Sequence, residues 1–261
     1  MRSTAGLVLA VLLSSFASGC HYYFGDDDVD DDGADDDVAD EGGGGVLDGG
    51  TPEPDAPGEC DPIALLPTLY RPVEVVSSGA VANEPDPQQA EVFTTTVDAS
   101  AGGSSGQAEQ PFVYLDLDAA DGAAKVEIDD VAALESEEWD IALKRFVIRS
   151  NSGDSGLADV EVATVQADEL TFDDDVPSDR FADDDWSSAD CALETDASGG
   201  PRTRFSNWYR VQAGRFEAQP VVHLIRLGGG RYAEIDVLTY YGDDADPDRS
   251  GVYALRWRRF P

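Results

Sequence analysis

The side chains that most often carry out catalysis are scarce in this chain. Its 261 residues include two histidines, His21 and His223, so there are few places for an imidazole to activate a nucleophile. His223 lies in the apolar run VVHLIRL, where a lone histidine is typical of a core residue. The spacings of a phosphate-binding loop, a Cys-x-x-Cys zinc site and a HExxH helix are missing from the sequence. Carboxylates are so abundant that no acid and base pair stands out. We therefore expect that the protein is not an enzyme.

One group of carboxylates has the spacing of a calcium loop. Asp28, Asp30 and Asp32 alternate and precede a glycine, a pattern in which carboxylates converge on Ca²⁺ while the glycine makes the bend. An EF-hand would have a bidentate Glu at the twelfth position, where this chain has Ala39. With Asp36 included, the pattern is closer to a turn of the thrombospondin type 3 kind. The alternative is a solvated acidic tether without calcium, and the sequence leaves both interpretations open.

Cys20 follows a segment that is typical of an export signal. Arg2 precedes an apolar run over residues 7–13, which is too short to span a bilayer. The small residues Ala17-Ser18-Gly19 directly before Cys20 resemble a lipobox, at which a signal peptide is removed and the cysteine is lipidated. We expect residues 1–19 to be a lipoprotein signal peptide and Cys20 to anchor the protein in the outer membrane, at its cell-surface or periplasmic face. The alternative is a secreted protein in which Cys20 is incidental.

The two remaining cysteines, Cys60 and Cys191, are expected to form a disulfide. They are the only thiols left once Cys20 is lipidated. Export places them in an oxidising compartment, where such a pair is stable as a disulfide.

The distribution of charge and apolar residues separates a tether from a folded domain. The formal net charge is -37, with 54 acidic against 17 basic residues, and this excludes nucleic acid as a partner because phosphate binding needs a cationic surface. Residues 26–61 contain too few apolar side chains to build a core. We expect an acidic, Asp/Gly/Pro-rich tether over residues 20–67 and a single domain over residues 68–261, which is long enough to bury a substantial core.

The domain reads as a mainly antiparallel all-β fold. The alternation of apolar and polar residues predicts strands at 73–76, 91–97, 160–165 and 253–257, and hairpins over 112–128 and 221–241. The first hairpin is expected to begin with a strand that has one apolar and one polar face, and the only helix is expected over residues 131–138.

The stretch WDIALKRFVIRSNSGDSG, residues 139–156, reads as a buried strand followed by a polar loop. Its alternation changes parity at Lys144-Arg145. Such a change indicates a β-bulge or a strand that is buried on both faces.

Several of these runs resemble the HmuY family of bacterial surface lipoproteins. The most specific part is WDIA at residues 139–142 with the Asn/Gly turn that follows it. Asn207-Trp208-Tyr209, the run VVHLIRLGGGRYAEIDVLTYY and Gly251-Val252-Tyr253 extend the resemblance towards the C-terminus. The resemblance implies a HmuY-like β domain that is attached to the outer membrane and holds haem between extended loops with two axial side chains.

The resemblance places the ligand-binding loops between residues 151 and 205, and there the sequence departs from the family. A bis-imidazole site needs two histidines, but this segment contains neither His nor Met. The remaining candidates for haem contacts are a phenolate, a core imidazole and two stacking indoles: Tyr209, His223, Trp186 and Trp208. Hydrophobic packing is the alternative role of the aromatic residues. The haem propionates would need basic partners, for which the candidates are Lys144, Arg145, Arg149, Arg202 and Arg204.

The sequence therefore predicts a non-enzymatic cell-surface lipoprotein of HmuY type that binds haem, or a related hydrophobic small ligand, without the usual bis-histidine site. The alternative is a structural or interaction lipoprotein that binds no haem and responds to calcium. The sequence indicates no particular protein partner.

Overall fold

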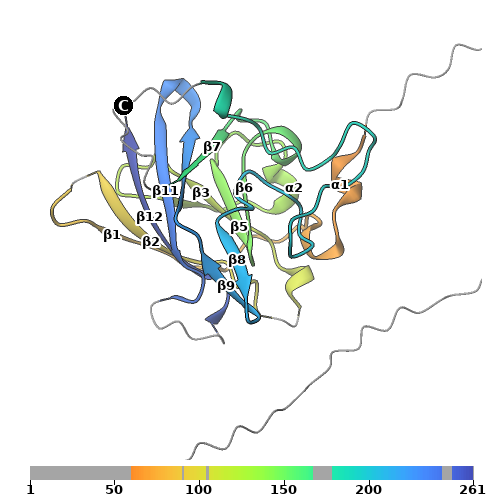
Figure 1. The fold of residues 1–261 in the computed structure, drawn as a ribbon, viewed down its shortest axis with the longest axis horizontal. Coiled ribbons are helices and arrows are strands. Elements are labelled where there is room, and N and C mark those ends of the chain that lie inside the picture. Colours follow the sequence, from red (N-terminus) through yellow and green to blue (C-terminus); the bar gives the residue numbers. More distant parts are fainter. Residues whose placement is uncertain (1–59, 90, 104–105, 167–177, 243–248, 261) are drawn as a thin grey trace, which may run out of the picture. The chain divides into compact units, whose positions relative to one another are not determined.

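The computed structural model describes residues 60–89, 91–103, 106–166, 178–242 and 249–260. They all belong to the second of two units, Met1–Pro54 and Asp55–Pro261. Two antiparallel sheets and a separate hairpin make up this unit (Figure 1), which confirms the expected all-β fold. Cys20 and the candidate calcium ligands Asp28, Asp30, Asp32 and Asp36 lie outside the described residues.

The larger sheet has six strands in the order β1-β2-β12-β11-β10-β7, and every neighbouring pair is antiparallel. The strands are β1 (Val81–Pro85), β2 (Val92–Asp98), β7 (Glu161–Gln166), β10 (Val221–Arg226), β11 (Tyr232–Thr239) and β12 (Val252–Phe260). β10 and β11 form the predicted hairpin around Gly228–Gly230. Gly229 has a φ of 75°, which glycine adopts without steric cost.

The smaller sheet has four strands in the order β4-β3-β5-β6. These strands are β3 (Val113–Asp116), β4 (Ala124–Val126), β5 (Ile141–Lys144) and β6 (Val147–Ser150). β8 (Tyr209–Gln212) and β9 (Arg215–Ala218) form the separate hairpin. The main core lies between the two sheets, where Leu115, Leu143 and Ile148 of the smaller sheet share one cluster with Ile235 and Leu255 of the larger one.

Helices are short in the described part of the chain. The α-helices are α1 (Pro62–Leu65) and α2 (Asp130–Ala133). The 3-10 turns span Thr68–Tyr70, Gln107–Glu109, Gly153–Ser155, Ser178–Arg180 and Gly228–Gly230. None of the described helices has the length and apolar character needed to cross a membrane.

The stretch around Lys144 and Arg145 is a tight hairpin rather than one strand. Lys144 pairs with Val147, so Arg145 and Phe146 form a two-residue turn. The predicted bulge is wrong, but the predicted burial on both faces is confirmed, because every residue of β5 and β6 is buried. The apolar pattern changes parity because the chain reverses direction. Arg145 makes the turn with a φ of 51°, a conformation that is uncommon for a residue other than glycine and that the sequence does not signal.

Three other predictions differ from the structure. Residues 73–76 form no strand and contribute only the bridge between Val76 and Asp129, while the edge strand β1, which is rich in polar residues, was not predicted. The predicted polar face of β3 is partly buried, because Tyr114 has no exposed surface whereas Asp116 is half-buried. The predicted helix over 131–138 is the single turn α2, which begins after Asp129, whose side chain accepts hydrogen bonds from the first backbone N–H groups.

Residues 60–71 pack onto the outer face of the smaller sheet, and we call this segment the strap. Asp61 caps α1 by accepting hydrogen bonds from the N–H groups of Ile63 and Ala64. Leu66 and Tyr70 are buried in a second hydrophobic cluster, together with residues of β3, β5 and β6 that point away from the main core. The end of the segment expected to be a tether therefore belongs to the folded unit. In Figure 1 the strap is the orange segment that carries α1.

Candidate ligand-binding site

The described part of the predicted ligand loops packs against the sheets. Asp184 has no exposed surface, and its carboxylate accepts hydrogen bonds from the backbone N–H groups of Ser150 and Arg204 at 2.5 Å each. Burial raises the pKa of Asp184 to about 6 because it disfavours the charged form. Trp186 and Phe205 are also buried. These residues fasten the loop to the end of β6.

Trp208 and Tyr209, two of the candidate haem contacts, lie together in an aromatic cluster. We call this the tyrosine cluster and define it as Tyr70, Phe146, Trp208, Tyr209, Phe216, Tyr240 and Tyr253. The ring of Trp208 lies 4.8 Å from that of Tyr209, 5.6 Å from that of Tyr240 and 5.3 Å from that of Tyr253, measured between centroids. The cluster draws these rings from the strap, the β5–β6 turn, β8 and the residue before it, β9, β12 and the residue after β11. It presents a large apolar surface with several phenol groups.

The hydroxyl groups of this cluster are poorly placed to lose their protons. Tyr209 donates a hydrogen bond of 2.5 Å to Asp196, and its hydroxyl is also paired with that of Ser198. Burial and the bond to Asp196 raise the pKa of Tyr209, and burial raises the pKa of Tyr240 to about 12. Since a tyrosine binds iron as the phenolate, this environment opposes the axial role considered for Tyr209.

His223 is a core residue, as its sequence context indicates. It lies on β10 with no exposed surface, and its ring centroid is 4.6 Å from that of Phe205. Nδ1 lies 3.3 Å from the hydroxyl of Thr164, and burial lowers the pKa of His223 to about 3. The imidazole is therefore neutral and enclosed. Trp186 lies elsewhere, in the cluster beneath the strap, so the four candidate haem residues do not form one site.

Two buried cations lie beneath the strap. Lys144 has no exposed surface and Arg149 is 2% exposed. The guanidinium carbon of Arg149 is 4.1 Å from the centre of the Phe112 ring, and Nζ of Lys144 is 5.6 Å from the same centre. Arg149 donates a hydrogen bond of 2.7 Å to the hydroxyl of Tyr114, which in turn donates one of 2.9 Å to Asp130. We call these five residues the cationic cluster.

The cationic cluster is incompletely paired. Within the part of the chain that the structure describes, neither Nζ of Lys144 nor Nε of Arg149 has a hydrogen-bond partner. Burial lowers the pKa of Lys144 to about 8, although the charge of Asp130 opposes this change. Burial also raises the pKa of Asp130. With all three groups ionised, two positive charges face one negative charge in a site without water access, an arrangement that costs several kcal/mol.

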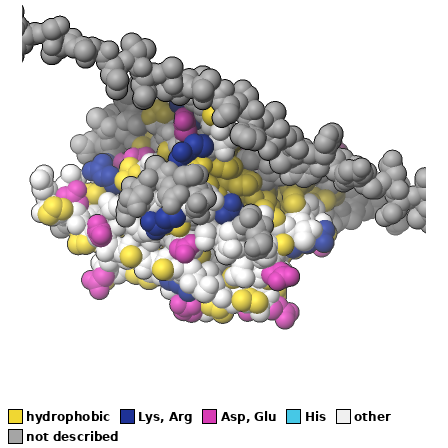
Figure 2. All heavy atoms as spheres, turned by 90° about the horizontal axis from the view of Figure 1, so that it is seen from below, with side chains coloured by type: hydrophobic (Ala, Val, Ile, Leu, Met, Phe, Trp, Pro, Cys, Tyr) yellow, Lys and Arg dark blue, Asp and Glu magenta, His cyan; other side chains and the backbone are white. Residues whose placement is uncertain are grey.

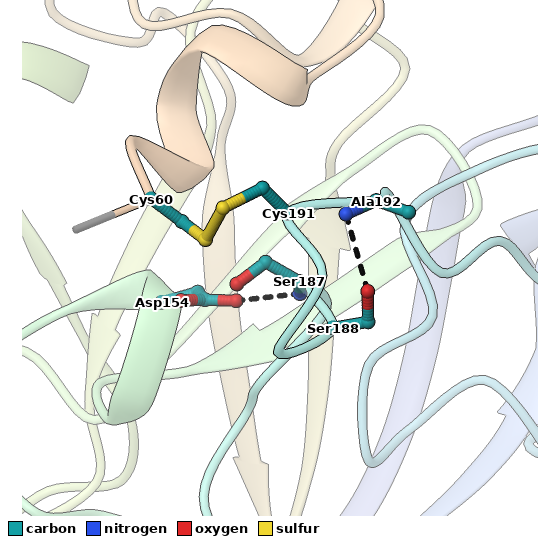
Figure 3. Close-up of a disulfide and its surroundings, with 6 residues drawn as sticks. All are labelled: Cys60, Asp154, Ser187, Ser188, Cys191 and Ala192. Carbon is teal, nitrogen blue, oxygen red and sulfur yellow. Dashed lines mark hydrogen bonds between the residues drawn. A yellow bond between two sulfur atoms is a disulfide. The ribbon is translucent and has the colours of Figure 1, made fainter. Parts of the chain in front are cut away.

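The Cys60–Cys191 disulfide fastens the strap, and its presence confirms the predicted pairing. The two Cα atoms are 5.4 Å apart. Figure 3 shows that the loop carrying Cys191 is itself held in place, because the carboxylate of Asp154 accepts a 2.7 Å hydrogen bond from the N–H of Ser187. The same carboxylate accepts a 2.9 Å bond from the N–H of Trp186. The disulfide thus joins the strap to the loop that places Trp186 against it.

Several hollows on the surface of the described domain are lined by charged side chains. One of about 330 Å³ lies on the outer face of the larger sheet, over Glu234, Asp236, Arg256 and Arg258. Figure 2 likewise shows acidic and basic side chains spread together over one face of the molecule. Neither Trp208 nor Tyr209 lines this hollow. This hollow and the candidate haem residues therefore do not form one site.

One acidic group gathers near β3 and β5. Asp116, Asp118 and Asp140 place carboxylate oxygens within 4.8 Å of one another. Burial raises the pKa of Asp140 to about 7, and Arg231 already pairs with Asp118 at 2.7 Å. The group is thus partly neutralised by the protein itself.

Comparisons with known proteins agree with the sequence motifs. A family model described as HmuY protein matches residues 108–256. Similar solved structures include a Bacteroides vulgatus protein described as HmuY-like and haem-binding, with 18% identity, a TM-score of 0.42 and coverage of 71% of this chain and 97% of that one. The apo HmuY analogue of Tannerella forsythia has 14% identity, a TM-score of 0.40 and coverage of 70% and 97%. A Bacteroides fragilis protein described as a lipoprotein has 17% identity, a TM-score of 0.39 and coverage of 64% and 90%. No curated protein matches the chain.

Proposed function

Because the chain belongs to the HmuY family, we propose that it is a non-enzymatic, lipid-anchored protein that binds haem or a related planar hydrophobic ligand. The observation that carries this proposal is the family match, which spans residues 108–256 and so includes both the cationic cluster and most of the tyrosine cluster. Buried aromatic rings suit a planar apolar ligand, and buried cations suit its carboxylates.

The described residues do not fit a haem site with two strong axial ligands. Their one histidine, His223, is enclosed in β10 and has no exposed surface. The phenol of Tyr209 is held in its protonated form by burial and by Asp196. The ligand is therefore held by ring stacking and by charge pairing with its carboxylates rather than by coordination of the metal.

The chain organisation that we propose matches this role. Residues 1–19 direct export, Cys20 carries the lipid anchor in the outer membrane, the tether runs from residue 20 to the strap, and the strap and the residues after it form the binding domain. The small residues before Cys20 support the anchor, and the packing of Leu66 shows that the last part of the tether segment joins the domain. Mass spectrometry of the mature protein should find a lipid on Cys20. An unmodified Cys20, or retention of residues 1–19, would contradict the anchor.

Tryptophan fluorescence tests the binding proposal. Trp139, Trp186 and Trp208 are buried near the two clusters, so a bound porphyrin should quench their emission. We expect ferric haem and iron-free protoporphyrin to give saturable quenching with similar affinity, because metal coordination contributes little. Quenching by neither compound would reject the proposal and leave an interaction lipoprotein as the function. A strong preference for the iron-containing compound would show that a metal ligand has been missed.

A further inference from the structure

Lys144 and Arg149 project from the same face of adjacent strands. In the β5–β6 register Lys144 pairs with Val147 and Ala142 pairs with Arg149. Ala142 and Val147 belong to the hydrophobic cluster beneath the strap, so the two cations share this face with them. Both cations lie against the Phe112 ring. The face therefore combines two positive charges with an aromatic floor.

The donors on this face outnumber the acceptors. A lysine ammonium has three N–H donors, yet Nζ of Lys144 has no partner within the described residues. Asp130 already accepts hydrogen bonds from the N–H of Phe112, the hydroxyl of Tyr114 and the N–H of Val73. An additional anion would complete the cluster. A carboxylate suits it because its two oxygens can accept bonds from both cations.

The strap packs over this face together with Ala133 of α2 and Trp186. It contains α1 and a 3-10 turn but no strand, so it is not part of either sheet. Leu66 and Tyr70 hold it through side-chain packing, Trp186 donates a 3.4 Å hydrogen bond to the carbonyl of Pro62, and the disulfide fixes its N-terminal end. Lys144 has no exposed surface, so a ligand can reach it only if part of the structure that covers this face moves.

We propose that the strap is a cover over the ligand site, and that a planar ligand binds beneath it with a carboxylate paired to Lys144 and Arg149. This inference rests on the proposed function and makes it specific: the ligand class is a planar, carboxylate-bearing compound. It also accounts for a buried lysine whose amine has no hydrogen-bond partner among the described residues. The cost of burying Lys144 is recovered when the ligand supplies the missing negative charge.

The test compares the wild type with a Cys60→Ser/Cys191→Ser variant, in which the strap is unfastened. Each protein is titrated with ferric haem and with haem dimethyl ester, which has the same ring but no carboxylates. We expect the variant to bind haem about tenfold more tightly than the wild type, because a larger fraction of its molecules is open. The ester should bind the variant about tenfold more weakly than haem, because the charge-assisted hydrogen bonds are lost.

Two lysine substitutions distinguish a direct role of Lys144 in binding from a general effect of removing a positive charge. Lys144→Met in the unfastened variant should weaken haem binding about tenfold and leave ester binding unchanged. The matched control is Lys125→Met, which removes a lysine that pairs with Glu127 and should change neither affinity. Equal effects of the two substitutions on haem binding would overturn the inference, as would equal haem affinities of the wild type and the unfastened variant.

The outcomes also distinguish this inference from the proposed function. If haem and its ester bind every protein equally, the proposed function stands and the strap-covered site is wrong. If neither compound binds any protein, both are wrong. If the cysteine variant fails to fold, hydrogen exchange of residues 60–71 in the wild type, measured with and without haem, tests whether the strap covers the ligand site. Haem must change their protection, and unchanged protection would overturn the inference.

Discussion

Replacing Lys144 by methionine should make the protein more stable at neutral pH. The substitution keeps a long, unbranched side chain but removes an amine that is fully buried and has no hydrogen-bond partner among the described residues. Most substitutions of buried residues destabilise a protein. An increase in the free energy of unfolding would show that burying Lys144 destabilises the native fold, as is common for residues at binding sites.

The size of the gain follows from the pKa of Lys144. Burial lowers this pKa from its ordinary value of 10.5 to about 8, which at about 1.4 kcal/mol per pH unit corresponds to roughly 3 kcal/mol. The native state binds this proton more weakly than the unfolded state does, so the full cost applies below pH 8. It declines as the pH rises from 8 to 10.5 and is absent above that range. Imperfect packing of the methionine side chain offsets part of this stabilisation, so the expected increase in the free energy of unfolding is about 2 kcal/mol at pH 7.

Urea unfolding at pH 7 and at pH 10.5 provides the assay. Lys144→Met should raise the free energy of unfolding by about 2 kcal/mol at pH 7 and by much less at pH 10.5. Lys125→Met is the control, because this amine is paired with the carboxylate of Glu127 and donates a hydrogen bond to the carbonyl of Ser77, so its removal should not raise the free energy of unfolding. A Lys144→Met protein that is less stable than the wild type at pH 7, or equally stabilised at both pH values, would refute this reasoning.

Reducing the Cys60–Cys191 disulfide, which joins positions separated by 131 residues, should lower the free energy of unfolding by about 5 kcal/mol in the chain-entropy model. Urea unfolding with and without dithiothreitol measures this loss, and a difference below about 1 kcal/mol would contradict the model. Because burial raises the pKa of Asp140 to about 7, the native state binds this proton more tightly than the unfolded state does. Stability should therefore increase as the pH falls from 8 to 5, and Asp140→Asn should reduce that increase; thermal unfolding across this range would show an unchanged slope if the argument is wrong. Tyr209→Phe removes a hydroxyl that bonds to Asp196 and should cost about 1–3 kcal/mol. Tyr240→Phe removes a hydroxyl that has no hydrogen-bond partner in the described part of the chain and should cost little. Equal losses of stability in the two variants would count against the hydrogen-bond assignment.

The strands that the sequence predicts well are those with a strong local signal. Residues 221–241 combine apolar, β-branched runs with three consecutive glycines, and they form the hairpin of β10 and β11. β1 was not predicted because VANEP has no regular apolar alternation and ends in proline, a residue that a sheet tolerates at an edge strand. The β5–β6 turn was not predicted because Arg145 adopts a left-handed conformation without a glycine or asparagine to indicate it.

The candidate site depends on contacts between distant segments, which local patterns do not reveal. The pairing of Cys60 with Cys191 followed from the number of cysteines. By contrast, charged residues are expected at the surface, so nothing local indicated that Lys144 and Arg149 are buried together. The strap residues Leu66 and Tyr70, which pack on the same face, lie about eighty positions earlier in the sequence. The tyrosine cluster likewise collects rings from Tyr70 to Tyr253.

The absorption spectrum of the protein during titration with ferric haem tests the central claim most directly. We predict a saturable change with the features of high-spin iron, because the described residues offer no accessible imidazole and the phenol of Tyr209 keeps its proton. The spectrum should be the same in His223→Ala, since His223 is enclosed in β10. A tight, low-spin spectrum of the bis-histidine type would contradict the account, and its loss in His223→Ala would identify His223 as the missed ligand.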